Sequence, residues 1–217
     1  IHIYGPKGIK EAITLLLKLG DSWTNYPLRF HELTSKKSEL IFEDANVSVE
    51  TIPLNHRVYT NGFLFREKLG DRKLNVEAVA KYKIDKCYFQ NIKNGMDITL
   101  ENGTIIQNSK LTFDPPKAKC YAYCSDTGFY PEIIDQIKNV DALYHESTFL
   151  ETEAELSIKT KHATAKEAAT IAREASVGML ILGHYSTRYK SLALFKEEAN
   201  MIFPHVVLAD DGKQIEF

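Results

Sequence analysis

Residues 180–189 of the chain have the sequence LILGHYSTRY. The apolar run 179–182 predicts a short buried strand, and Gly183 marks its end. An apolar strand does not need polar side chains directly after it for its own burial, yet this one is followed by a group of them. The group comprises His184, Ser186, Arg188 and Tyr189.

These side chains suit the chemistry of a functional site. The planar guanidinium of Arg188 can donate two parallel hydrogen bonds to a phosphate. The imidazole of His184 can bind a metal ion or transfer a proton. A buried strand that presents both groups at its carboxyl end is typical of the edge of an active site.

The rest of the sequence predicts an α/β fold, because strands and helices alternate after Lys119 while hairpins dominate before it. We expect a single domain, 1–217. The predicted strands are 1–4, two or more within 40–54, 62–66, a hairpin at 97–106 with a type I′ turn at Asn102-Gly103, 120–124, 140–146, 179–182, 206–209 and 214–217. The predicted helices run from Gly5-Pro6 to Gly20, over 76–81, 131–138, 164–175 with a capping box of Thr164 and Glu167, and 192–203 with Leu194, Phe195, Ala199 and Ile202 inward.

The composition excludes several classes of protein. A net charge of −2 over 217 residues provides no global field for nucleic acid, so an RNA substrate would need a local basic patch. No run of 18 apolar residues predicts a membrane span, and the start resembles no signal peptide. Because it begins inside a predicted strand without Met, we expect the chain to be part of a longer protein. Three cysteines without a CxxC pair favour thiols in a reducing cytoplasm.

Four predicted strand ends carry polar groups in succession. Besides 180–189, they are TIPLNH, which ends at His56; the segment after 120–124, with Ser125, Asp126 and Thr127; and the segment 145–148, with His145 and Glu146. A further histidine, His162, precedes the helix predicted from Thr164. Carboxyl ends of strands converge on the ligand crevice of layered α/β folds. The sequence therefore predicts a single site, with His56, Asp126 and His184 as metal ligands.

The sequence resembles the ribonuclease Z family, whose members are tRNA 3′-processing endonucleases of the metallo-β-lactamase superfamily. The resemblance extends from IYGPKGI at 3–9 to ADDG at 209–212. SDTGF at 125–129 resembles the family's GDT segment, and HESTF at 145–149 resembles its HEAT motif. KHATA at 161–165 resembles HST, and GHYSTRY at 183–189 resembles H-x-S-x-R-Y. The resemblance implies a metallo-β-lactamase fold, an αββα four-layer sandwich that is incomplete here at its N-terminus.

The resemblance also implies a site with two zinc ions. His56 would bind one zinc, His184 the other, and Asp126 would bridge them. His162, oriented by Glu146, would donate a proton to the departing 3′ oxygen of the precursor tRNA or stabilise the transition state. Ser186 and Arg188 would bind phosphate, with Tyr189 and Thr127 as further substrate contacts. Homodimers are also implied.

The sequence departs from the family pattern in one major respect. The motif HxHxDH, which supplies further metal ligands and the expected general base, is absent from these 217 residues. In the family it precedes the segment that resembles Ile1–Gly8, so we expect it upstream in the gene. The 217 residues alone should therefore hold zinc poorly and not cleave RNA, and metal analysis would test this.

A second departure concerns a tRNA-binding arm, which the resemblance places within 67–92. Lys86-Cys87 stands where Gly-Pro is expected, although basic residues are frequent there. Two alternative functions stay open: a phosphodiesterase of the same fold that acts on small phosphoesters, and an inactive tRNA-binding module. The substrate that is cleaved distinguishes the first, and the upstream gene sequence distinguishes the second.

Overall fold

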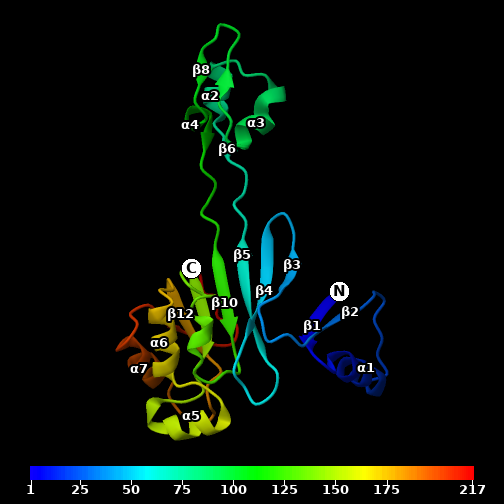
Figure 1. Cartoon of the computed structure of the whole chain (residues 1–217), viewed down its shortest axis with the longest axis vertical. Helices are drawn as coiled ribbons and strands as arrows, with labels where there is room; N and C mark the ends of the chain where they lie inside the picture. Colours follow the sequence, from blue (N-terminus) through cyan, green and yellow to red (C-terminus); the bar gives the residue numbers. More distant parts are fainter. The chain divides into compact units, whose positions relative to one another are not determined.

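The computed structural model describes all residues from Ile1 to Phe217. The chain forms two compact units (Figure 1). Unit 1 comprises Ile1–Phe42, Val49–Phe65 and Cys120–Phe217, and unit 2 comprises Glu43–Ser48 and Arg66–Lys119. No helix has the length and apolar composition needed to cross a membrane.

A seven-stranded sheet with the order β13-β12-β11-β10-β5-β4-β3 is the main element of the fold. The four strands β10 to β13 are neighbours in chain order and pair in parallel, which confirms the predicted α/β class. The strands are β3 (Leu40–Glu43), β4 (Val47–Pro53), β5 (Asn61–Glu67), β10 (Cys120–Cys124), β11 (Ala142–Glu146), β12 (Met179–Gly183) and β13 (Val206–Leu208). Between the parallel strands lie the 3₁₀ turns η2 (Pro131–Ile133) and η3 (Glu151–Glu153) and the helices α5 (Ala154–Thr160), α6 (Ala165–Glu174) and α7 (Ala193–Asn200).

The main core lies between this sheet and helices α6 and α7. Helix α6 begins with the predicted capping box, in which the Thr164 hydroxyl accepts from the Glu167 backbone and the Glu167 carboxylate accepts from the Thr164 backbone. Its buried face consists mainly of alanines, which allow a helix to approach a sheet closely. Ile171 is fully buried there, which contributes about 1.5–3 kcal/mol. This packing fixes the strands whose carboxyl ends carry the site.

The N-terminal segment forms a small parallel pair of strands, β1 (His2–Pro6) and β2 (Arg29–Leu33), joined through helix α1 (Ile9–Leu19). The prediction that Gly5-Pro6 opens this helix was wrong, because both residues belong to β1. The helix begins after Gly8, whose φ of 93° is a left-handed conformation that favours glycine. Helix α1 ends at Gly20, as predicted.

Unit 2 has its own apolar core, made of Val79, Ile84, Ile92, Ile98, Ile106 and Leu111. Its elements are β6 (Lys73–Leu74), α2 (Val76–Lys81), η1 (Lys86–Tyr88), α3 (Phe89–Lys93), β7 (Ile98–Thr99), β8 (Ile105–Ile106), α4 (Asn108–Leu111) and β9 (Thr112–Phe113). The hairpin predicted over 97–106 forms from β7 and β8. Its turn is not type I′, because Gly103 has a positive φ but Asn102 does not; the Leu100 N–H donates to Thr104, which leaves a three-residue loop.

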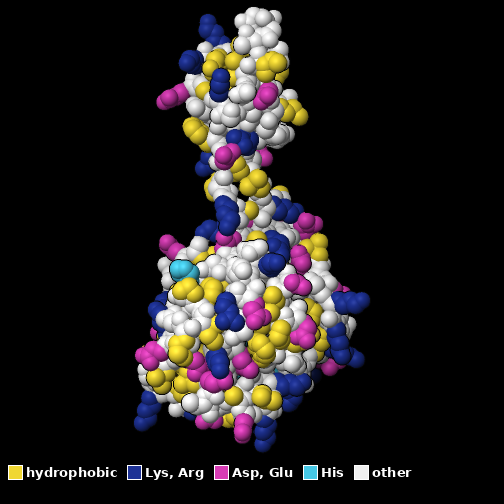
Figure 2. Space-filling model, turned by 60° about the vertical axis from the view of Figure 1, so that its left-hand side comes forward, with side chains coloured by type: hydrophobic (Ala, Val, Ile, Leu, Met, Phe, Trp, Pro, Cys, Tyr) yellow, Lys and Arg dark blue, Asp and Glu magenta, His cyan; other side chains and the backbone are white.

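Three other predictions need correction. Residues 131–138 form only the 3₁₀ turn η2 followed by turns. In α7 (Ala193–Asn200), Phe195 and Ala199 are buried as predicted, but Leu194 is 46% exposed. Leu194 and Phe195 are adjacent in the helix, so their side chains point in different directions, and Phe195 takes the inward one. Residues 214–217 pair with no strand. Basic and acidic side chains are interspersed over the visible surface of unit 1 in Figure 2, in keeping with the balanced charge.

Candidate metal and phosphate site

Three adjacent parallel strands bring the predicted site residues together. Glu146 is the last residue of β11, and His184 directly follows β12. Asp126 follows β10 by two residues. Because β10, β11 and β12 pair in parallel and in this order, their carboxyl ends share one edge of the sheet.

Glu146 is the centre of the site and is completely buried. Its Oε1 accepts hydrogen bonds from the Thr127 backbone N–H at 2.6 Å and from His162 Nδ1 at 2.8 Å. Its Oε2 accepts from the Thr148 hydroxyl at 2.6 Å and from the Ala163 backbone N–H at 3.1 Å. A carboxylate offers about four acceptor positions, so these donors satisfy it. Glu146 is therefore an organiser of its neighbours and has no acceptor position left for a metal ion.

The Thr148 hydroxyl determines how His184 is oriented. This hydroxyl has one hydrogen, which it donates to Glu146, so it must accept from His184 Nδ1 at 2.8 Å. The second ring nitrogen of His184, Nε2, then carries a lone pair. It lies 3.1 Å from Asp126 Oδ1, which is also an acceptor. Two acceptors at this distance need a cation or a proton between them.

His162 and His56 are oriented in the same way. His162 donates from Nδ1 to the Glu146 carboxylate at 2.8 Å. His56 donates from Nδ1 to the Lys161 backbone carbonyl at 2.8 Å, since a carbonyl oxygen can only accept. The ring centres of His56 and His162 are 5.0 Å apart, and those of His162 and His184 are 5.3 Å apart. Three neighbouring imidazoles thus use Nδ1 to hold the ring and leave Nε2 for a metal ion or a proton, as metal-binding or proton-transferring histidines require.

This donor set fits a divalent transition metal. One potential ligand atom from each of four residues, Asp126, Glu146, His162 and His184, lies within 4.8 Å of the others. Glu146 is excluded by its complete set of hydrogen bonds. The remaining imidazole nitrogens and carboxylate oxygen are the ligand types that zinc takes in proteins. His56 lies outside this group of four but next to His162.

The backbone is strained at two of these residues. Asp126 has a φ of 57° and His184 a φ of 60°, in the left-handed region that residues other than glycine seldom adopt. Each such conformation costs about 1–3 kcal/mol and persists where the surroundings enforce it. Both residues follow strands of the parallel sheet. The left-handed conformation redirects the chain at these points, where Asp126 Oδ1 and His184 Nε2 lie 3.1 Å apart.

The predicted phosphate-binding residues lie beside this group. Arg188 donates from Nε to the Ser186 hydroxyl at 3.2 Å and from Nη1 to the Glu153 carboxylate at 3.4 Å. Its guanidinium also lies over the ring of Phe149, with 5.1 Å between Cζ and the ring centre. The arginine is therefore held in place while its side chain stays 45% exposed, so it keeps donors for an anion.

Two predicted substrate contacts have other partners in the structure. Thr127 is completely buried, and its hydroxyl donates to the Gly128 carbonyl while accepting from the Asn55 N–H. The Tyr189 hydroxyl accepts from the Leu150 N–H at 3.0 Å, and its ring packs edge-on against Phe195. Both hydroxyls thus support the site from within the chain, and their contact with a substrate stays a prediction.

Sequence reasoning gave no role to Thr148 or to Lys161. Thr148 lies two residues after Glu146, so an extended chain places both side chains on the same side, and this spacing could have indicated their contact. Lys161 acts on His56 through its backbone carbonyl, which has no signature in the sequence. Its φ of 58° ends helix α5 and turns that carbonyl toward His56.

Comparisons with known proteins show which chains this one is similar to. No family model matches the chain. A ribonuclease Z from Bacteroides fragilis is 41% identical over 214 residues, which are 98% of this chain and 70% of that protein. A ribonuclease Z from Bacteroides thetaiotaomicron is 43% identical over 212 residues, covering 98% of this chain and 67% of that protein.

Solved structures share the fold. The short form of human tRNase Z superposes with a TM-score of 0.61 at 19% identity, covering 100% of this chain and 67% of that one. The metallo-β-lactamase fold protein YhfI from Bacillus subtilis gives a TM-score of 0.59 at 15% identity, covering 98% of this chain and 63% of that one. The predicted metallo-β-lactamase fold is thereby confirmed.

Proposed function

The chain belongs to the ribonuclease Z family of phosphodiester-hydrolysing endoribonucleases, and from this premise we propose that it acts in zinc-dependent cleavage of tRNA precursors to remove the 3′ trailer. One observation carries the proposal: three adjacent histidines donate from Nδ1 to fixed acceptors, which leaves Nε2 of each ring for a metal ion or a proton. A core histidine without a function needs no such common orientation.

Asp126, His184 and His56 are the residues that would hold the zinc ions. Nε2 of His184 and the carboxylate of Asp126 already face each other at 3.1 Å, which suits a shared cation. A zinc ion bound by these residues would supply Lewis-acid activation for the hydrolysis of a phosphodiester near neutral pH. The acceptor on each Nδ1–H fixes the ring so that little reorganisation accompanies binding.

His162 is the proposed proton donor to the departing 3′ oxygen. Its Nε2 would first take up a proton and then transfer it to that oxygen, while the buried Glu146 carboxylate, 2.8 Å from Nδ1, stabilises the intervening imidazolium. Arg188 would bind a non-bridging oxygen of the scissile phosphate, with Ser186 bracing it.

Cleavage of a precursor tRNA by the full-length gene product, with the new 3′ end mapped, tests this function. We expect His162→Gln to lower kcat by ~10²–10⁴-fold, as for loss of a general acid. His205→Gln removes an exposed histidine outside the site and is the matched control. Cleavage of a small phosphodiester but of no precursor tRNA would contradict the proposal and favour the small-molecule phosphodiesterase.

We further propose that unit 2 is the tRNA-binding arm expected from the sequence. Arg72 pairs with Asp114 at 2.5 Å and Lys68 with Glu43 at 2.9 Å, so neither is a free cation. Lys73 and Lys83 are exposed and make no ion pair. Replacing both by Gln should lower the salt dependence of precursor tRNA binding, whereas an unchanged slope would contradict the arm's role.

A homodimer is proposed on the same family basis. Light scattering of the purified protein tests it, and a monomer at assay concentration would overturn it.

A further inference from the structure

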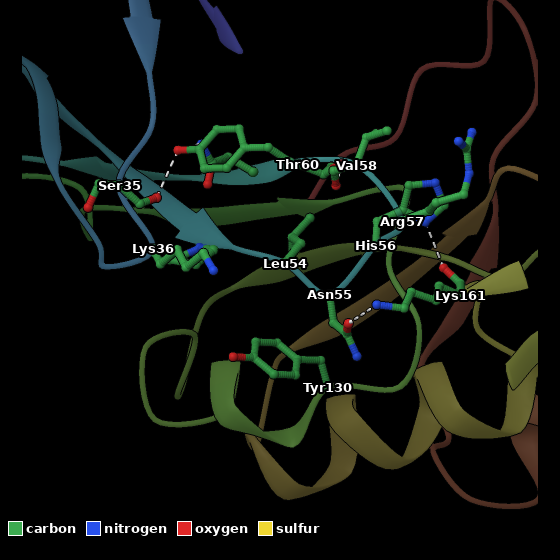
Figure 3. Close-up of a pocket in the computed structure, with 13 residues that line it drawn as sticks. Ser35, Lys36, Leu54, Asn55, His56, Arg57, Val58, Thr60, Tyr130 and Lys161 are labelled. Carbon is green, nitrogen blue, oxygen red and sulfur yellow. Dashed lines mark hydrogen bonds between the residues drawn. The ribbon is translucent and has the colours of Figure 1, made fainter. Parts of the chain in front are cut away.

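A cavity of about 400 Å³ lies in unit 1 beside His56 (Figure 3). Its walls are the segment Pro53–Asn61, together with Ser35, Lys36, Tyr130 and Lys161. In Figure 3, Lys36 and Lys161 extend from opposite sides toward Leu54 and Asn55. The volume lies in the range of small-ligand sites, about 300–1,000 Å³.

The lining of this cavity is basic. Lys36, Arg57 and Lys161 contribute three positive charges, and no Asp or Glu is among the lining residues. Lys36 and Arg57 are exposed and form no ion pair. Lys161 makes only a long hydrogen bond of 3.4 Å, from Nζ to the Asn55 amide oxygen. In a chain with a net charge of −2, three unpaired cations around one cavity create a local positive potential that attracts anions.

The cavity is connected to the metal and phosphate site through two residues. His56 lines the cavity, and its ring centre is 5.0 Å from that of His162. Lys161 fixes the His56 ring through its carbonyl while its ammonium group reaches into the cavity. An RNA strand whose phosphate is bound at the site would therefore place its neighbouring nucleotide beside these cations.

The cavity also has aromatic and hydrogen-bonding groups. Tyr59 is held by the bond from its hydroxyl to the Ser35 carbonyl at 2.8 Å, and Asn61 donates to the same hydroxyl. Tyr130 is half-buried against the main core. Rings on a positively charged wall are the combination that binds a nucleotide of a single strand, because the base stacks while the cations meet the phosphate.

We propose that this cavity, the Lys36–Arg57–Lys161 groove, binds a nucleotide of the RNA that neighbours the scissile phosphate. Its phosphate lies among the three cations and its base against Tyr130. The inference rests on the proposed function, and it adds a binding subsite to that function. The nucleotide belongs either to the 3′ trailer or to the end of the acceptor stem, which present the same chemistry.

The test compares the double variant Lys36→Gln/Arg57→Gln with the control Lys37→Gln/Lys190→Gln in the full-length gene product. Lys37 is the exposed neighbour of Lys36 and Lys190 is exposed, and neither lines the groove. Precursor tRNA binding is measured by fluorescence anisotropy between 50 and 200 mM salt. We expect the groove variant to lower the slope of log affinity against log salt by ~0.7 per cation lost for a single strand. KM should rise severalfold with little change in kcat.

A second pair of variants tests the aromatic wall. Tyr130→Ala should raise KM, and Tyr130→Phe should restore it because the ring is kept. A tRNA without trailer separates the two sources: a binding deficit confined to trailer-bearing RNA places the nucleotide in the trailer, and an equal deficit places it in the acceptor stem.

The inference is overturned if the groove variant has the slope and KM of the control. If the unmodified protein neither binds nor cleaves precursor tRNA, the proposed function fails and this subsite with it. If the unmodified protein cleaves precursor tRNA but the groove substitutions change neither the salt slope nor KM, the subsite alone is refuted.

Discussion

Each unit of the molecule has one buried polar residue at the centre of a hydrogen-bond network. In unit 1 it is Glu146, and in unit 2 it is Asn108, which is 7% exposed. Asn108 donates to the carbonyls of Ile92 at 2.7 Å and Met96 at 2.9 Å, and accepts from the Thr112 hydroxyl at 2.8 Å. Both networks obey the rule that buried polar groups find partners.

The two networks differ in what lies at their ends. The Asn108 network ends mainly on backbone carbonyls and serves to hold β-strands and helices of unit 2 together. The Glu146 network ends on Nδ1 of His162 and, through Thr148, on Nδ1 of His184, and neither second ring nitrogen belongs to the network. A buried network that ends on backbone carbonyls has a structural role. A buried network that ends on histidine rings orients the side chains of a reactive site.

The largest expected effect that tests this distinction is that of Glu146→Gln. The glutamine amide puts an NH₂ donor where one carboxylate oxygen of Glu146 accepts hydrogen bonds, and the four groups around it are all donors. The substitution also removes the negative charge that orients His162. We expect cleavage to fall ~10²–10⁴-fold and the free energy of unfolding to fall by ~1–3 kcal/mol. Glu167→Gln is the control, because a glutamine preserves the capping box of α6. Activity within a few-fold of the unmodified protein would refute the central role of Glu146.

Thr148→Val sharpens the comparison because it keeps the shape of the side chain and removes only the hydroxyl between Glu146 and His184. We expect zinc affinity to fall ~10–100-fold, as for other residues that orient a metal-binding histidine. Isothermal titration of the full-length gene product measures this affinity. Thr148→Ser should restore it, and equal affinities for all three proteins would contradict the role of the hydroxyl.

Asn108→Ala should affect stability alone. It leaves the Met96 carbonyl without its donor, whereas the Ile92 carbonyl keeps the Gly95 N–H as a donor. One unsatisfied carbonyl costs about 1–3 kcal/mol. Chemical denaturation measures the loss, with Asn91→Ala as an exposed control. A change in zinc affinity would show that the Asn108 network is not purely structural.

A smaller, pH-dependent effect is expected at His145, which is 1% exposed. It donates from Nδ1 to the Glu146 carbonyl, its Nε2 has no partner, and burial lowers its pKa. The unfolded state therefore binds the proton more readily than the folded state. The contribution of His145 to the free energy of unfolding is fully present above its unfolded pKa of about 6.5. It decreases as pH falls below that value, by at most ~1.4 kcal/mol per pH unit. His145→Asn should flatten this slope and His205→Asn should not; equal slopes would refute the assignment.

The sequence predicted those parts of the molecule that depend on local pattern. Apolar strands followed by His184, Asp126 and Glu146 predicted that these residues meet at one edge of a parallel sheet, and the structure has them there. This was predictable because strand direction follows from the alternation of helices and strands. The sequence did not predict the Thr148 bridge or the Lys161 carbonyl, which depend on tertiary placement and on the backbone. The strand expected at 214–217 also failed, since an alternating pattern does not specify a partner strand.

The account depends most directly on the tautomers of three histidines. Long-range ¹⁵N–¹H NMR correlation on the metal-free full-length gene product above pH 7 reports which ring nitrogen carries the hydrogen. The account predicts the Nδ1–H form for His56, His162 and His184, with added zinc perturbing the Nε2 signals of His56 and His184. Nε2–H forms at these positions, or Nε2 signals that zinc leaves unchanged, would contradict it.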